Sequence, residues 1–473
     1  MANNATTPRI GGKIRRLRRQ RSMNQSDLAS ALGISASYLN LIEHNRRNVT
    51  VPLLLKLAGY FGLEITDLSE GDEASTANDL MECFGDEIFA DIDITNMDVR
   101  DVASSNPSVA KAMLHLYDTL QELRKNGASK VADTDEEGES EARGLASEPV
   151  SDFLQANSNF FPSLEKVAER VRSDCELSDG EFLQGLTVFL SNAFDVRTRF
   201  IGLPNRQARR FDPQNGKLEI AQSLSLQSRI FQVAVQVALL AGKYELDTLI
   251  EEGGFPGEDA RILARTALAN YCAAAILMPY DHFLSVAQEV RYDVDLMSQQ
   301  FLVSFEQICH RLTTLQKPGA RGLPFHMVRS DIAGNISKRF SLSGIHIPRH
   351  SGACPRWNVY TAFLHPGHIN VQISEMPDRR RYFCIARTIV KGEHRFGAQM
   401  RHLSIGLGVD ISYARQLVYS DGLHLKEERN IVPIGVSCRV CPRLECSERA
   451  FPPAHYKLNL DANKRGASAY ISA

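Results

Sequence analysis

Three cysteines near the C-terminus have the residue type and spacing of metal ligands. Cys438, Cys441 and Cys446 form a C-x2-C-x4-C pattern among turn-forming residues. Thiolates this close together suit a tetrahedral metal ion or an iron–sulfur cluster, and spacing alone does not separate zinc from iron–sulfur. Both kinds of site normally take four ligands. The pattern therefore predicts a fourth ligand elsewhere in the chain, and the alternative is three thiols that bind no metal.

Two further cysteines are candidates for that ligand. Cys354 lies in the loop-like segment Gly-Ala-Cys-Pro, whereas Cys384 lies in residues 381–387, which read as a strand that turns this cysteine into the core. Cys354 is therefore the better candidate. The N-terminus lacks the pattern of a signal peptide, so we expect a cytoplasmic protein whose nine cysteines are thiols or metal ligands rather than a disulfide framework.

The N-terminal residues have the order of a DNA-reading element. A helix is expected over residues 10–21 and another over 24–32, and Gly33 then supplies a turn before Ser35 caps a third helix. This is the spacing of a helix-turn-helix, whose second helix enters the major groove. The expected DNA contacts are Gln25, Ser35, Ala36, Ser37, Tyr38, Asn40, Arg46 and Arg47. Of these, Gln25, Arg46 and Arg47 suit phosphate better than base edges.

The charge distribution supports this interpretation. The whole chain has a net charge of −2, but residues 1–68 contain ten Lys and Arg against four Asp and Glu, a local net charge of +6. The basic N-terminal region, called the head below, can bind the phosphate backbone of DNA, whereas the acidic remainder of the chain would be repelled by it. The alternative, a small helical bundle with a basic surface, does not account for the glycine turn, the cap and the apolar pattern together.

The middle of the chain invites comparison with metallopeptidases, in which H-E-x-x-H on a helix binds zinc and supplies a base. At the best counterpart, Val235, Gln236 and Leu239 stand where His, Glu and His are required. None of the three can bind zinc or activate water. We therefore expect no peptidase activity, and no enzyme activity at all.

These sites require a multidomain fold: an all-α helix-turn-helix head, a mainly helical middle domain, and an α+β C-terminal domain with a cysteine-rich loop. The expected parts are a head at 1–70, a connector with an acidic linker at 71–149, a helical domain at 150–315, an α+β domain at 316–460, and a tail at 461–473. A chain of 473 residues is longer than one hydrophobic core usually supports. The chain contains no run of 18 consecutive apolar residues, so we predict no membrane-spanning helix.

Hydrophobic periodicity predicts the elements within these parts. Five short helices are expected over 9–68, and Pro107 is expected to open a helix. An acid-rich linker is expected at 126–149. Further helices are expected at 182–194, 230–240 and 260–278, with a hairpin turn at 213–216. Strands are expected at 325–329, 345–347, 358–363, 369–373 and 382–388.

Several longer motifs resemble a known family. They are Ala269-Asn270-Tyr271, Leu277–Tyr280, Val303–Gln307, Cys309–Gln316, Asp331–Lys338, Cys354-Pro355-x-Trp357-Asn358, Gly406-Leu407-Gly408 and Cys438–Pro453. Over residues 9–455 the chain is similar to the short-chain fatty acyl-CoA regulators, bacterial regulators of propionate and acetate assimilation. The head by itself resembles the repressor/Cro-like DNA-binding family, whose members bind operators as dimers.

The resemblance implies a transcription regulator that senses an acyl-CoA and binds an operator as a homodimer or higher homo-oligomer. It also implies a four-iron cluster on the cysteine motif, with Cys354 as fourth ligand, and zinc is the alternative. Coenzyme A has several phosphates and an adenine, so it needs several cations. The candidates are Arg311, Lys317, Arg321, Lys338 and Arg339. The open alternatives are a redox or iron sensor that binds no coenzyme A, and a regulatory peptidase.

Overall fold

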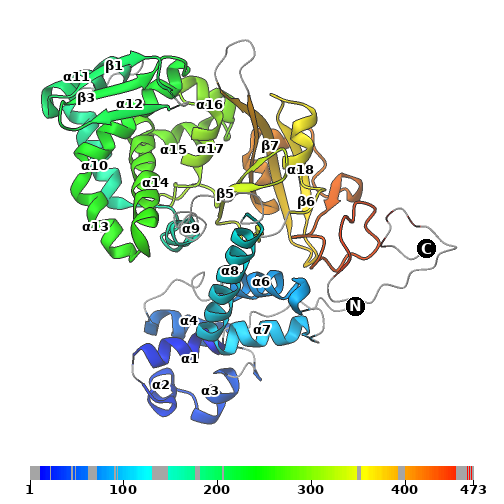
Figure 1. Ribbon diagram of the computed structural model, residues 1–473. Helices are drawn as coiled ribbons and strands as arrows, with labels where there is room; N and C mark the ends of the chain where they lie inside the picture. The colour runs from blue at the N-terminus through cyan, green and yellow to red at the C-terminus, as the bar shows by residue number, and fades with distance from the viewer. Residues whose placement is uncertain are drawn as a thin grey trace. The chain divides into compact units, whose positions relative to one another are not determined.

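The computed structural model describes most of the 473-residue chain. The described residues are 11–21, 23–43, 46–47, 49–61, 72–89, 92, 94–129, 147–175, 182–204, 207–348, 353–392, 400–453, 466, 468 and 470. They form two compact units, one from the described residues up to 120 and the other from those between 121 and 452 (Figure 1). Each unit has hydrophobic cores of its own.

The first unit begins with the helix-turn-helix. Its helices are α1 (Gly11–Gln20), α2 (Gln25–Leu32), α3 (Ala36–Glu43) and α4 (Val51–Phe61). Four of the five helices expected over residues 9–68 thus lie in the described part of the chain, and residues 62–71 fall outside it. The core of this group contains Leu28, Leu32, Leu39 and Ile42, as the apolar pattern predicts, and Ile34 packs against it.

Local chemistry explains where these helices begin and end. Asn24 and Asp27 form a capping box, in which each side chain accepts a hydrogen bond from the other residue's backbone N–H. Helix α2 ends because Gly33 adopts a left-handed φ of +68°, which costs glycine little. The Tyr38 N–H donates to Ser35 Oγ at 3.1 Å, so Ser35 caps α3 as expected.

A second helical group completes the first unit. It consists of α6 (Asp72–Phe84), the 3-10 turn η1 (Glu87–Phe89), α7 (Asn96–Ser105) and α8 (Pro107–Ser129). The part of α8 that follows residue 120 belongs to the second unit. Leu80, Val99, Ala110 and Tyr117 are among the residues of its small core. Pro107 opens α8 as predicted. Both ends of the linker expected at 126–149 are helical, because α8 runs to Ser129 and α9 begins at Ser147, and residues 130–146 lie outside the described part of the chain.

The helical part of the second unit has nine helices among the described residues. They are α9 (Ser147–Ala156), α10 (Pro162–Asp174), α11 (Phe182–Phe194), α12 (Leu226–Ala241), α13 (Lys243–Gly253), α14 (Gly257–Leu277), α15 (Tyr280–Glu289), α16 (Val294–Gln300) and α17 (Phe305–Leu312). Helix α14 lies between α10, α12 and α13 (Figure 1). The helices expected at 182–194, 230–240 and 260–278 are confirmed as α11, α12 and α14.

A three-stranded sheet accompanies these helices. Its strands are β1 (Arg197–Ile201), β2 (Arg209–Asp212) and β3 (Lys217–Ala221), in the order β1-β3-β2. The expected hairpin is β2–β3, which are antiparallel, and β1 adds to β3 in parallel. Gly216 in the turn has a φ of +56°, and a Cβ there would lie 2.5 Å from the Asp195 carbonyl oxygen.

A six-stranded sheet forms the C-terminal part of the same unit. Its strands are β4 (His326–Asp331), β5 (Ile336–Ser341), β6 (Asn370–Glu375), β7 (Arg381–Lys391), β8 (Arg401–Asp410) and β9 (Ile431–Pro433). Their order is β5-β4-β8-β7-β6-β9, antiparallel except for the parallel pair β6–β9. Short helical elements follow the strands: α18 (Asn358–Thr361), η3 (Ala362–Leu364), η4 (Ile411–Gln416), η5 (Val418–Ser420) and η6 (Glu428–Asn430).

Two of the expected strands are wrong. Residues 345–347 are irregular, although Ile345 and Ile347 are buried in the core on one face of the sheet. Residues 358–363 form α18 and the start of η3, because the Asn358 side chain donates to the carbonyl oxygens of Asn370 and Cys384 and so holds this segment across the strands. Of the strands in this sheet, β5, β8 and β9 were not expected.

The middle and C-terminal parts of the chain share one hydrophobic core. It runs from Val150 through α10, α12, α14 and α17 to β4, β7 and β8 and ends at Leu417. Within the described residues, no individual helix has both the length and the apolarity needed to cross a bilayer, and α14 and α15, bent by 68°, meet that test only as a pair.

Candidate functional site

The outward face of α3 presents small and polar side chains. Ser35, Ala36, Ser37 and Asn40 are exposed, while Tyr38 is half-buried and packs against the core of the head. Arg46 and Arg47 are exposed immediately after the helix. A helix face of this composition can approach base edges closely, and the flanking guanidinium groups can reach phosphates.

An ion pair that the sequence analysis missed holds α3 in place. Arg18 on α1 donates to both carboxylate oxygens of Glu43, at 2.7 and 2.9 Å, and the Gln25 amide nitrogen donates to the same carboxylate at 2.8 Å. Burial alone would raise the pKa of Glu43, but the hydrogen bonds from Arg18 and Gln25 outweigh it and the pKa lies below its usual value. Gln25 therefore positions α3, and only one of its amide hydrogens remains for the predicted phosphate contact.

The cysteine-rich segment lies beside β9. The Cys354 N–H donates to the Val436 carbonyl oxygen at 3.0 Å, which joins the Cys354 turn to the start of this segment. Burial raises the pKa of Cys354 to about 11, and the neighbouring Cys438 and Cys441 add to this effect. The Cys354 turn therefore adjoins the start of the cysteine-rich segment at Val436, although Cys354 and Cys438 are 84 positions apart in the sequence.

Arg449 organises this loop. Its guanidinium donates to the carbonyl oxygens of Cys438, Cys441 and Arg443, at 2.6, 2.8 and 2.8 Å. The Ala450 N–H donates to Cys438 Sγ at 3.5 Å, and Gly435 leaves room for Cys441, since a Cβ on the glycine would lie 2.7 Å from Cys441 Sγ. All nine cysteines are free thiols. Among the described residues, no three His, Cys, Asp or Glu side chains converge closely enough to hold a metal ion.

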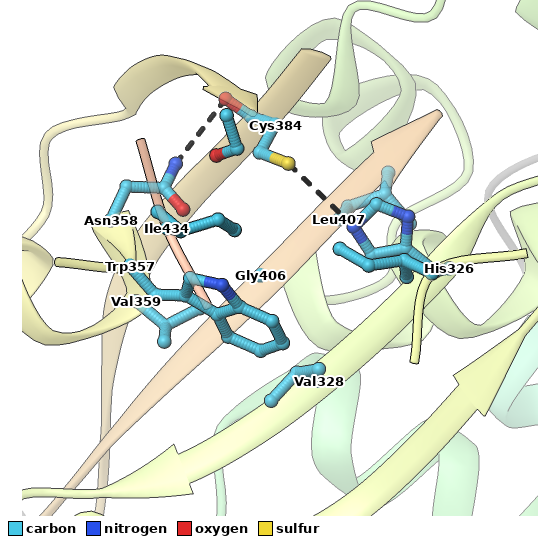
Figure 2. Close-up of a pocket in the computed structure, with 11 residues that line it drawn as sticks. His326, Val328, Trp357, Asn358, Val359, Cys384, Gly406, Leu407 and Ile434 are labelled. Carbon is cyan, nitrogen blue, oxygen red and sulfur yellow. Dashed lines mark hydrogen bonds between the residues drawn. The ribbon is translucent and has the colours of Figure 1, made fainter. Parts of the chain in front are cut away.

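Cys384 belongs to the core of the sheet, as predicted. Its sulfur lies 3.6 Å from His326 Nε2, and both side chains line a cavity of about 20 Å³ (Figure 2). Trp357 lines the same cavity, and its indole nitrogen has no hydrogen-bond partner among the residues described. The cavity has room for about one water molecule. Burial raises the pKa of Cys384 to about 12 and lowers that of His326 to about 3, so both groups are neutral near pH 7.

Three family models match consecutive parts of the chain. A helix-turn-helix model matches residues 14–68, an IrrE N-terminal-like domain model matches 192–313, and the C-terminal model of the short-chain fatty acyl coenzyme A regulators matches 314–470. The HTH-type transcriptional regulator RamB of Mycobacterium tuberculosis strain H37Rv is 38% identical over 469 residues, which cover 98% of each chain.

The chain belongs to the short-chain fatty acyl coenzyme A regulator family. The propionyl-CoA carboxylase regulator of Cereibacter sphaeroides is 36% identical over 471 residues, which cover 97% of this chain and 98% of that protein. A solved structure of a Mycobacterium tuberculosis transcriptional regulator superposes with a TM-score of 0.66 at 36% identity, covering 69% of this chain and 100% of that one.

The peptidase-like part of this regulator carries no zinc-binding residues at the expected positions of α12. Val235 and Gln236 are buried in the core between α12 and α14, and Leu239 is half-buried. Apolar and amide side chains in these positions pack the helix against its neighbours. The match to the IrrE-like model thus describes the fold of this part of the regulator.

Arg311 is not available to coenzyme A, and that prediction is wrong. The side chain is fully buried, and its guanidinium donates to both oxygens of Glu165, at 2.7 and 2.9 Å. It also donates to the Met278 carbonyl oxygen and Thr314 Oγ1, while the Tyr271 hydroxyl donates to Glu165. Arg311 therefore joins α17 to α10 and α14. The apolar pattern around it gave no signal of a carboxylate 146 residues away.

The other four predicted cations lie in different surroundings. Lys317 pairs with Asp281 at 3.3 Å and Arg321 is exposed. Arg339 is paired with Glu148 on α9. No hydrogen bond or ion pair between described residues joins these predicted cations to one another.

Lys338 lies in a basic group that sequence reasoning only partly found. Glu306 at the start of α17 accepts from Arg329 at 2.8 Å, pairs with Lys391, and has Lys338 Nζ at 3.8 Å. Burial alone would raise the pKa of Glu306, but the three cations outweigh it and lower the pKa to about 2. Three cations around one carboxylate leave two positive charges in excess, on side chains that are partly exposed.

Proposed function

We propose that this regulator binds a specific operator through α3 and that a short-chain acyl-CoA controls this binding. The observation that carries the DNA part is the exposed face of Ser35, Ser37 and Asn40 on a helix that is capped, packed and followed by Arg46 and Arg47. Two-fold symmetric operators are the usual targets of such heads, so we further propose a homodimer or higher homo-oligomer, acting in the cytoplasm.

The acyl-CoA part is supported by the family to which the chain belongs and by a relative named for propionyl-CoA carboxylase. Phosphates need cations that are not already neutralised. Lys338, with the excess positive charge of its group, meets this condition better than Lys317, which has a carboxylate partner, and Arg321 stays a proposed contact. The proposed effector is acetyl-, propionyl- or butyryl-CoA.

We also propose that Cys354, Cys438, Cys441 and Cys446 hold a four-iron cluster, with zinc as the alternative. The support is the C-x2-C-x4-C pattern of thiols together with the Cys354 turn, which is joined to this segment through Val436. The Arg449 side chain donates to the carbonyl oxygens of Cys438 and Cys441 within the same segment. A bound cluster supplies a redox-sensitive cross-link between the Cys354 turn and the C-terminal loop. Cys438 and Cys446 are half-exposed, so an oxidant can reach them.

A titration of DNA binding tests the function directly. Fluorescence anisotropy of anaerobically purified regulator, with DNA from upstream of its own gene and random DNA of equal length, gives the specificity ratio with and without each acyl-CoA. We expect one acyl-CoA to change the affinity for the upstream DNA while free coenzyme A changes it less. An unchanged affinity with all three thioesters would contradict acyl-CoA control.

The half-exposed thiols favour a second candidate, a redox sensor that binds no coenzyme A. In that case the operator affinity differs between aerobic and anaerobic protein and is insensitive to every acyl-CoA. The same anisotropy experiment, repeated after exposure to air, separates the two functions.

A further inference from the structure

A lysine on β5 and an arginine on β4 lie side by side against α17. Lys338 pairs with Arg329 in the strand register, and paired residues of neighbouring strands point to the same face of the sheet. Glu306 and His310, one helical turn apart on α17, both meet this pair. Glu306 accepts from Arg329 at 2.8 Å, and His310 Nε2 lies 3.3 Å from Lys338 Nζ. The amine of Lys338 is therefore held at a defined position.

Positive charge crowds this amine. Like charges opposite each other on neighbouring strands repel, and Lys391, at the end of β7, brings a third cation to the carboxylate of Glu306. Among the described residues, no second carboxylate pairs with these three cations. Burial and the charges of Arg329 and Lys391 lower the pKa of Lys338 to about 8, against the opposing charge of Glu306. A larger share of this amine is therefore unprotonated near neutral pH than in an ordinary lysine.

The surroundings also leave the amine accessible. Burial lowers the pKa of His310 to about 3, so its imidazole is neutral near pH 7. In the tautomer that carries its proton on Nδ1, this ring accepts from Lys338 without adding a charge. The Lys338 side chain is 41% exposed and that of Lys391 is 49% exposed, so a small solute can reach both. An unprotonated and exposed lysine amine is a nucleophile.

The three cations favour one kind of electrophile. They leave two positive charges in excess around one carboxylate, which suits a phosphate dianion. In an acyl phosphate the reactive carbonyl carbon is bonded directly to a phosphate oxygen. A phosphate held by Arg329 and Lys391 therefore keeps that carbon within reach of Lys338 Nζ. In an acyl-CoA the pantetheine arm separates the thioester from the phosphates, so the same contact does not bring its carbonyl to the amine.

We propose that Lys338 is a covalent acylation site whose acyl donor is a short-chain acyl phosphate. The unprotonated Nζ attacks the carbonyl carbon, a C–N bond forms, the C–O bond to the phosphate breaks, and the proton lost by the nitrogen leaves with inorganic phosphate. This step does not depend on acyl-CoA control, but its consequence rests on that proposed function. The product is a neutral amide that cannot make the phosphate contact proposed for Lys338, so acylation should weaken the response to acyl-CoA.

Peptide mass spectrometry of the full-length regulator, treated with acetyl phosphate, tests the site. Lys338 should be acetylated at least about tenfold faster than Lys317, because more of its amine is unprotonated and the donor is held beside it. Lys317 is the matched control, since its side chain is similarly exposed, at 43%, but has a carboxylate partner in Asp281. Inorganic phosphate should compete and slow the reaction at Lys338. Equal rates at the two lysines, or a rate at Lys338 that phosphate leaves unchanged, would overturn the proposal.

A change of donor separates phosphate recruitment from the reactivity of the amine. Lys391→Gln should slow acetylation of Lys338 by acetyl phosphate at least about fivefold, and should slow acetylation by acetyl-pantetheine, an uncharged thioester, much less. Equal slowing with both donors would contradict recruitment through the phosphate.

The anisotropy titration described above measures the consequence for DNA binding. The response of the regulator to acyl-CoA should fall in proportion to the acetylated fraction of Lys338, and a response that acetylation leaves intact would contradict the regulatory role. If the unmodified regulator responds to no acyl-CoA, the proposed function is refuted, whereas the acetylation rates still decide whether Lys338 is a modification site.

Discussion

Removal of the Arg311 side chain should destabilise the second unit more than any surface substitution. Arg311→Met leaves the Glu165 carboxylate buried beside the Tyr271 hydroxyl and deletes four hydrogen bonds from the guanidinium. Breaking a buried ion pair from one side costs about 3–5 kcal/mol. Because domains are stable by only about 5–15 kcal/mol, the loss is a large fraction of the total.

The single tryptophan makes this loss measurable in the intact chain. Trp357 is the only tryptophan, and its side chain is buried in the second unit, so its fluorescence follows the unfolding of that unit without a signal from the head. With a slope of about 3 kcal/mol per molar urea, the predicted loss lowers the midpoint by about 1 M or more. The urea midpoint of Arg311→Lys should lie between those of Arg311→Met and the wild type, because lysine keeps the positive charge but cannot form the paired hydrogen bonds of a guanidinium.

Two controls make the result decisive. Arg429→Met breaks an exposed pair with Glu427 and should cost less than about 1 kcal/mol. The double variant Glu165→Gln, Arg311→Met removes both charges and should recover part of the loss. Two results would refute the argument that the unpaired Glu165 carboxylate causes the destabilisation. One is a loss below about 1 kcal/mol in the free energy of unfolding of Arg311→Met. The other is a double variant that is less stable than Arg311→Met, as it would be if the two substitutions acted independently.

Three further outcomes are expected. Asn40→Ala should reduce the discrimination between operator and random DNA, whereas Arg46→Ala should weaken both and lower the salt slope by about one unit, which anisotropy titrations at several salt concentrations measure. The anaerobically purified protein should show a broad absorption band near about 400 nm. Cys354→Ser should abolish this band, and Cys384→Ser should keep it. Stoichiometric zinc without acid-labile sulfide would exclude the iron–sulfur cluster. Burial lowers the pKa of His326 to about 3, whereas an unfolded histidine titrates near about 6.5. The contribution of neutral His326 to the free energy of unfolding should therefore be complete above about pH 6.5 and fall by up to about 1.4 kcal/mol per pH unit as the pH drops toward 3. His326→Gln should flatten this pH dependence of stability, which unfolding followed by Trp357 fluorescence measures.

Features that depend on neighbours within a few residues were predictable. The capping residue Ser35, the left-handed turn at Gly33 and the helix start at Pro107 each act within one helical turn, so their spacing in the sequence is their spacing in space. The same holds for α11, α12 and α14, whose apolar periodicity is continuous. The cysteine pattern of the C-terminal loop is local in the same sense.

Pairings across long stretches of chain were decided only by the tertiary structure. Arg311 reads as a surface cation at the end of a helix, yet Glu165 on another helix makes it a core residue. Residues 358–363 read as a strand, but the bonds of Asn358 to two strands make them helical. Arg209 and Arg210 are adjacent and chemically identical, and only the register with β3 gives Glu219 to one of them and not to the other. Whether a charge is neutralised depends on which groups tertiary packing brings within a few ångströms of it. The separation of two residues along the sequence does not predict that distance.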